Sequence, residues 1–175
     1  MKHFGKICFL ILILTALLSA GCQRKGLHKR ADITVPPVAT AAYTESAAPD
    51  ITILDTDGNS LRLSDLFGKP IVLKFFHPDH VHAVEDLILL QNAYDLHRED
   101  VQFVILTTRD PASLVFPEDT HISLPFFTDP DGSAFSAYGI VDRPVTVFID
   151  SDGFIAAKAQ DSIDKETLDF GMKMF

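Results

Sequence analysis

The sequence has 175 residues, enough for one domain with a hydrophobic core but not comfortably for two. Its formal net charge is −9, and because residues 1–21 contain two lysines and no acidic residue, the rest of the chain carries −11. Nucleic-acid binding depends on clustered lysine and arginine side chains. The acidic globular part has no basic stripe, so this composition excludes a nucleic-acid partner.

The first 21 residues predict a lipoprotein signal peptide. Lys2 and Lys6 precede an apolar run over residues 7–18, which gives way to small residues. This run is shorter than the roughly 20 residues that a helix needs to span a bilayer. The junction Leu-Ser-Ala-Gly-Cys at 18–22 resembles a bacterial lipobox, and the resemblance implies cleavage before Cys22 and attachment of lipid to it.

A lipidated Cys22 predicts a protein anchored in the cell envelope, outside the cytoplasm, on a periplasmic or outer surface. Several acyl chains on one residue hold a protein durably on a membrane. Cys8 lies in the cleaved peptide, so we expect no free thiol in the mature protein. Residues 22–48 are polar and lack an apolar period, which predicts a flexible tether, and residues 49–175 then form the domain.

The domain alternates strand-like and helix-like segments. Asp57-Gly58 separates two short alternating runs and predicts an N-terminal β-hairpin. A strand, a helix and a second strand then predict a β-α-β unit with parallel strands. The predicted strands lie at 51–54, 60–63, 71–76, 101–107, 124–127, 145–149 and 154–158, and the predicted helices at 83–97, 133–138 and 164–175. This order predicts an α/β fold with a central mixed β-sheet flanked by helices.

Three segments resemble the thioredoxin-like lipoproteins of the TlpA/ResA type and their AhpC/TSA peroxiredoxin relatives. They are the opening at 48–70, the strand at 71–76 and the segment 138–150, which contains Pro144 at the position of the family's cis-proline. The resemblance runs from about residue 48 to the end of the chain. It implies a thioredoxin-like fold and the label of a thiol-disulfide oxidoreductase or peroxidase.

The resemblance fails at the two positions that carry the family's chemistry. Counted without gaps from the strand at 71–76, the first redox cysteine falls on His80 and the second on Ala83. Neither residue forms a thiolate, the species that attacks a disulfide or a peroxide. The family therefore implies the fold and the location, while the residues predict that the protein is not an active enzyme of this kind.

The loop at 77–82, His-Pro-Asp-His-Val-His, is a candidate metal site. His77, His80 and His82 with Asp79 offer nitrogen and carboxylate ligands suited to copper or zinc, and His121 lies in a loop that can approach them. A weaker resemblance to the Sco-type copper proteins supports this hypothesis. In those proteins the loop carries Cys-Pro-Asp at the positions of residues 77–79 of this chain. Arg143 stands where that family has a distant histidine ligand. A solvated polar loop or a pH sensor explains the same histidines.

Arg143 and Pro144 are candidate partner-binding residues. A cis Pro144 exposes the backbone of Arg143 beside the 77–82 loop, where an extended peptide can add as a strand. A purely architectural role for Pro144, a carboxylate contact for Arg143 and a surface salt bridge for Arg143 stay open. The first hypothesis is therefore a partner- or peptide-binding module, the second a protein that binds or delivers copper or zinc, and the third an oxidoreductase with a degenerate active site.

Overall fold

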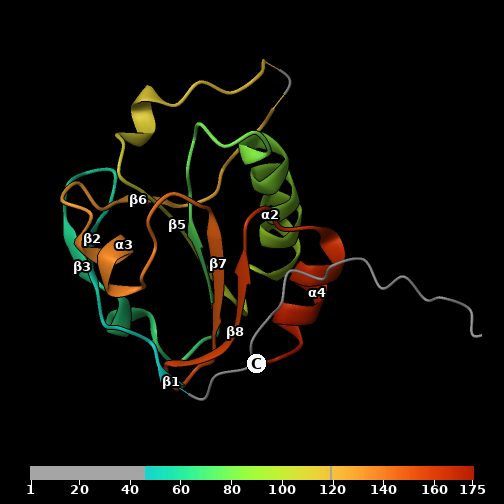
Figure 1. Ribbon diagram of the computed structural model, residues 1–175. Coiled ribbons are helices and arrows are strands. Elements are labelled where there is room, and N and C mark those ends of the chain that lie inside the picture. Colours follow the sequence, from blue (N-terminus) through green and yellow to red (C-terminus); the bar gives the residue numbers. More distant parts are fainter. Residues whose placement is uncertain (1–45, 119) are drawn as a thin grey trace, which may run out of the picture. The chain divides into compact units, whose positions relative to one another are not determined.

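The structure is a computed structural model that describes residues 46–118 and 120–175 (Figure 1). The predicted signal peptide, Cys22 and most of the predicted tether lie outside these residues. No helix of the described part is long and apolar enough to cross a membrane. The elements are β1 (Ser46–Ala47), β2 (Thr52–Leu54), β3 (Ser60–Arg62), the 3-10 helix η1 (Leu63–Leu66), β4 (Ile71–Phe75), α2 (Ala83–His97), β5 (Gln102–Thr107), the 3-10 helix η2 (Pro111–Ser113), β6 (Phe126–Thr128), α3 (Ser133–Ala137), β7 (Val145–Ile149), β8 (Phe154–Gln160) and α4 (Lys165–Met172).

The described strands form one mixed sheet in the order β1-β8-β7-β4-β5-β6-β2-β3. The central strand β4 runs parallel to β5 and antiparallel to β7. Helix α2 connects β4 to β5, which confirms the predicted β-α-β unit. Strands β2 and β3 pair antiparallel, which confirms the N-terminal hairpin. The fold is therefore the predicted α/β class.

Both faces of the sheet are buried, and β4 shows how the sequence achieves this. Successive side chains of a strand point to opposite faces, so Leu73 and Phe75 enter the core on the α3 face. Val72 and Phe76 enter the second core, which α2 and α4 cover. Figure 1 shows α3 on one side of the sheet and α2 and α4 on the other. Lys74 points to the α2 face, where it is fully buried.

The domain begins before the predicted boundary at residue 49. Ser46 and Ala47 pair with Ile155 and Phe154 of β8, and Ala48 is only 8% exposed. Hydrogen bonding along the edge of β8 and burial of a small apolar side chain bring these residues into the sheet. The prediction that residues 46–48 belong to the tether is therefore wrong.

The last helix is shorter than predicted. The Asp164 carboxylate caps α4 by accepting a hydrogen bond from the amide of Thr167 at 2.8 Å. The helix ends at Met172, after which the chain turns and Phe175 packs near Phe148 with ring centroids 6.3 Å apart. The amphipathic sequence pattern continues past Met172 because Met174 and Phe175 also pack against the core.

Candidate functional site

The 77–82 loop lies at the carboxyl end of β4, the edge of an α/β sheet where binding sites are usually built. It folds as two consecutive turns: the carbonyl of His77 accepts from the amide of His80, and the carbonyl of His80 accepts from the amide of Ala83, both at 3.0 Å. The second turn leads directly into α2. Because turns of this kind are tight, successive side chains of the loop point in different directions.

His77 lies on the inner side of the loop. Its ring packs edge-on against Phe135 of α3, with centroids 5.3 Å apart. Its Nε2 atom is buried and meets no hydrogen-bond partner among the described residues. Burial lowers the pKa of His77 from 6.5, the Asp142 carboxylate opposes this shift, and the charges of His80 and Lys74 add to it. A neutral imidazole is therefore favoured.

Asp79 points outward and pairs with Arg109, which follows β5. One guanidinium nitrogen donates to Oδ1 at 3.1 Å and the other to Oδ2, so the contact is bidentate. The two side chains are 75% and 52% exposed. Arg109 occupies both oxygens of the carboxylate that we considered as a metal ligand.

His80 turns toward the connection between β8 and α4. Its Nδ1 lies 3.5 Å from Oγ of Ser162 and accepts from the amide of His82 at 3.4 Å. The His80 and His82 rings are 6.0 Å apart between centroids. The loop thus brings two imidazoles near each other and sends the third, His77, into the α3 face.

The described residues do not assemble the predicted metal-ligand set. In residues 46–118 and 120–175, no group of three or more His, Cys, Asp or Glu side chains is placed to hold a metal ion. His121 is exposed, and the neighbouring Ser123 is held instead against α2 by two hydrogen bonds with Gln91, at 2.7 and 2.9 Å. The two turns place His77 against Phe135 and His80 near Ser162, which the spacing of the histidines did not reveal.

Pro144 does not adopt the cis form that the family resemblance implies. No peptide bond in the described part of the chain is cis, so the Arg143–Pro144 bond is trans, the isomer that X-Pro bonds intrinsically prefer. Pro144 is buried immediately before β7, whereas Arg143 is exposed and lies 3.5 Å from Asp161. The backbone amides of residues 141–143 donate to no other described backbone group.

A buried ion pair lies beneath the loop. Lys74 of β4 donates to Asp86 of α2 at 2.5 Å, with side-chain exposures of 0% and 2%. The other Asp86 oxygen accepts from the amide of Ile163 at 3.1 Å. Burial lowers the pKa of Lys74, and the Asp86 carboxylate raises it. Asp86 therefore joins β4, α2 and the β8–α4 connection, which holds Ser162 near His80.

A hollow of about 260 Å³ opens between the loop and the segment that follows β5. Its floor includes Phe76, Ala83 and Phe116, and the Asp79–Arg109 pair lies at its border. Ala83, where the gap-free count expects the family's second cysteine, is the first residue of α2 and is 5% exposed. Apolar side chains and the Asp79–Arg109 pair line the hollow together, so it offers both polar and apolar contacts.

Sequence reasoning missed Lys74, Asp86, Arg109, Asp161 and Ser162. A signal existed for the first two, because each is a charged residue inside an otherwise apolar buried pattern, and such residues are rarely buried without a partner. No sequence signal singles out the others, since their role depends on how separate loops meet in the fold.

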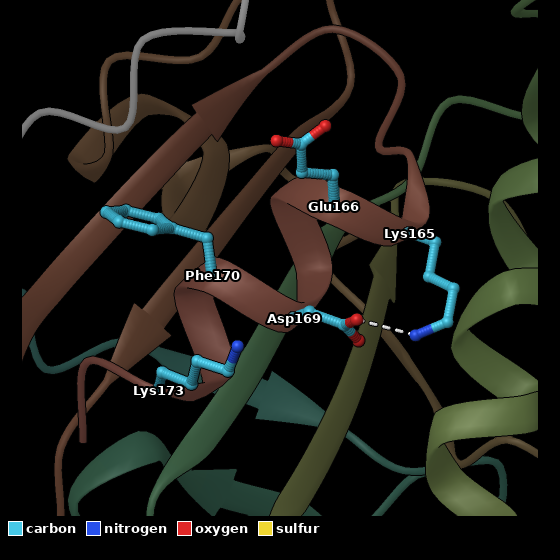
Figure 2. A pocket seen from close by; sticks show the side chains of 5 residues that line it. All are labelled: Lys165, Glu166, Asp169, Phe170 and Lys173. Carbon is cyan, nitrogen blue, oxygen red and sulfur yellow. Dashed lines mark hydrogen bonds and ion pairs between the residues drawn. The ribbon is translucent and has the colours of Figure 1, made fainter.

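Another hollow, of about 660 Å³, lies beside α4 (Figure 2). The five described residues that border it belong to or directly follow this helix, and Lys165 pairs with Asp169 at 2.5 Å. Phe170 is 45% exposed there. No residue of the 77–82 or 139–144 loops borders this hollow, so it is separate from the candidate site.

Comparison with known families identifies this arrangement. The model of the AhpC/TSA family matches residues 44–158, which include both strands β4 and β7 and the candidate site between them. Among curated proteins, the thiol-disulfide oxidoreductase ResA of Geobacillus thermodenitrificans is 25% identical over 132 residues, covering 74% of this chain and 76% of that protein.

Solved structures show the same architecture. The thioredoxin domain of a thiol-disulfide oxidoreductase from Bacteroides vulgatus superposes with a TM-score of 0.62 at 21% identity, covering 75% of this chain and 96% of that one. Peroxidoxin BcpB from Mycobacterium tuberculosis gives 0.63 at 18% identity, covering 75% and 95%. These similarities confirm the predicted thioredoxin-like fold.

Proposed function

We propose that this chain, which belongs to the AhpC/TSA family, is a membrane-anchored extracytoplasmic protein that binds a protein partner at the 77–82 loop and performs no thiol chemistry. The chain from residue 23 onward contains no cysteine, and His80 and Ala83 stand at the redox positions. Thiol-disulfide exchange and peroxide reduction both require a thiolate. The fold of the family is thus present without its reactive group.

The observation that carries the proposal is the presence of three exposed valines on loops at one edge of the sheet. Val81, Val115 and Val141 are 78%, 92% and 87% exposed. They lie on the loops that follow β4, follow β5 and precede β7, and the strand pairing brings these three loops to the same edge. Single exposed valines are ordinary, but a group of them on adjacent loops is typical of a protein-binding surface.

The hollow of about 260 Å³ lies on this surface, between the loops that carry Val81 and Val115. Its lining combines apolar side chains with the bidentate Asp79–Arg109 pair, so it offers a partner both apolar and polar contacts. Protein interfaces commonly combine the two kinds of contact.

The loop before β7 offers a second kind of contact. The open amides of residues 141–143 suit main-chain hydrogen bonds to an extended segment of the partner. This contact needs neither a cysteine nor a cis Pro144. The anchoring part of the proposal rests on the lipobox-like sequence before Cys22, which holds the domain at the envelope surface, where an extracytoplasmic partner meets it.

Site-specific photo-crosslinking tests the proposal on the full chain in the cell envelope. A photoreactive residue replaces Val81 in one variant and Leu96 in another, because both side chains are 78% exposed but Leu96 lies at the far end of α2. We expect discrete protein adducts from position 81 and none from position 96. Equal labelling from both positions, or none from position 81, contradicts a binding surface at the loop.

A further inference from the structure

A small hollow of about 170 Å³ lies on the α3 face of the sheet, next to the loop before β7. The residues at 139–143 border it together with Val145, Lys158 and Gln160. Lys158 pairs with Val147 across β7 and β8, so its side chain shares the face of the first core. The hollow therefore joins a half-buried lysine to the loop that carries Arg143.

Lys158 is a cation without a matching anion in the described part of the chain. Its ammonium donates to the backbone carbonyl of Tyr138 at 3.0 Å, and no described carboxylate lies within ion-pair distance of it. Burial lowers the pKa of Lys158, and no acidic group counteracts the shift. An ammonium has three hydrogen-bond donors, so a half-buried ammonium with a single hydrogen-bond partner has donors left for an anion.

Arg143 supplies a second cation at the same hollow. Its contacts with the two Asp161 oxygens are both 3.5 Å long and come from one nitrogen, so the rest of the guanidinium fork is not engaged by Asp161. Asp142 also borders the hollow, and its carboxylate opposes the lowering of the His77 pKa. The amides of residues 141–143, which donate to no other described backbone group, belong to the loop that borders the hollow.

We propose that this hollow binds a carboxylate of an extended partner segment, held by Lys158 and Arg143. Hydrogen bonds from these cations to a carboxylate are charge-assisted and shorter than neutral ones, and about 170 Å³ accommodates a carboxylate with its first methylene groups. The inference rests on the proposed function, because the segment that runs along residues 141–143 belongs to the partner. It adds the chemistry by which that partner is recognised.

Lysine-specific NMR of the full chain in detergent micelles tests this site without any partner. Acetate is the probe, chloride at equal ionic strength is the ionic control, and Lys69 is the matched residue, because its ammonium also donates to a single backbone carbonyl, that of Glu99. We expect acetate to cause a saturable shift at Lys158 and to raise the pKa of Lys158, with no saturable shift at Lys69. Arg143→Gln, an exposed change that spares the core, should weaken acetate binding about tenfold.

Two further probes separate the sources of the carboxylate. N-acetyl-alanine presents a chain end and the α-amide of N-acetyl-glutamic acid presents a side chain, while N-acetyl-glutamine amide is neutral. A saturable shift at Lys158 with one acid, but not with the neutral amide, identifies the kind of carboxylate that is bound and supports the site. No saturable shift at Lys158, parallel shifts at Lys69, or equal binding of the neutral amide overturns it. No saturable shift at Lys158, with crosslinking retained at position 81, rejects the carboxylate site and leaves the proposed function standing. A saturable shift without crosslinking rejects the partner surface and, with it, the assignment of the carboxylate to a partner.

Discussion

Two ion pairs at the 77–82 loop have opposite environments. Lys74–Asp86 lies beneath the loop with side-chain exposures of 0% and 2%, whereas Asp79–Arg109 lies on it with 75% and 52%. The first pair joins β4 to α2, whereas the second joins the loop to the segment that follows β5. The buried pair therefore stabilises the fold, whereas the exposed pair remains accessible to a partner.

Breaking the buried pair should have the largest effect. Asp86→Ala leaves the Lys74 ammonium buried without its carboxylate and also removes the acceptor for the Ile163 amide. We expect a loss of about 3–5 kcal/mol in the free energy of unfolding, measured by denaturant titration. The double variant Lys74→Met/Asp86→Leu should recover most of this loss, because it leaves no buried charge. A loss below about 1 kcal/mol for Asp86→Ala would contradict a structural role for the pair.

His77 should give the protein a smaller, pH-dependent component of stability. Its pKa is lowered in the folded state, so below about pH 6.5 the unfolded chain binds a proton that the folded chain resists. The free energy of unfolding should therefore fall as the pH drops through about 6.5 toward the folded pKa. His77→Phe, which keeps a ring against Phe135, should flatten this slope, and His82→Gln in the same loop should leave it in place. An unchanged slope in His77→Phe would show that a group other than His77 causes the pH dependence of stability.

Breaking the exposed pair should have the smallest effect on stability. Asp79→Asn removes a charge from a contact that water screens on both sides, so we expect a change of at most about 1 kcal/mol in the free energy of unfolding. The same variant should reduce photo-crosslinking from position 81, because it alters the border of the hollow. A change as large as that of Asp86→Ala would erase the distinction between the two pairs.

Local patterns predicted most of the fold. The apolar run at 71–76 and the helix at 83–97 were confirmed with their bounds nearly unchanged, since burial on both faces leaves a continuous apolar strand. Within that helix, Ile88 is 43% exposed although its spacing favours the buried stripe, while Asp86 is buried. Periodicity did not show that Lys74 lies opposite and provides Asp86 with a partner.

The site was less predictable than the fold. Sequence and family resemblance predicted the positions of His80, Ala83 and Pro144, but they did not predict where the side chains of the 77–82 loop point or the trans bond before Pro144. Those features depend on contacts between distant segments, such as His80 with Ser162 and Asp79 with Arg109. Two tight turns give His77 and His80 different neighbours, so the described residues do not gather the ligand set that the spacing suggested.

A disulfide-reduction assay tests most directly the claim that this family member works without thiol chemistry. The chain carrying Cys8→Ser and Cys22→Ser is compared with the same chain carrying in addition His80→Cys and Ala83→Cys, using insulin reduction as the readout. We predict that the first chain equals the protein-free blank and that the second gains activity, because the fold that supports the dithiol is retained. Turnover by the cysteine-free chain would contradict the claim.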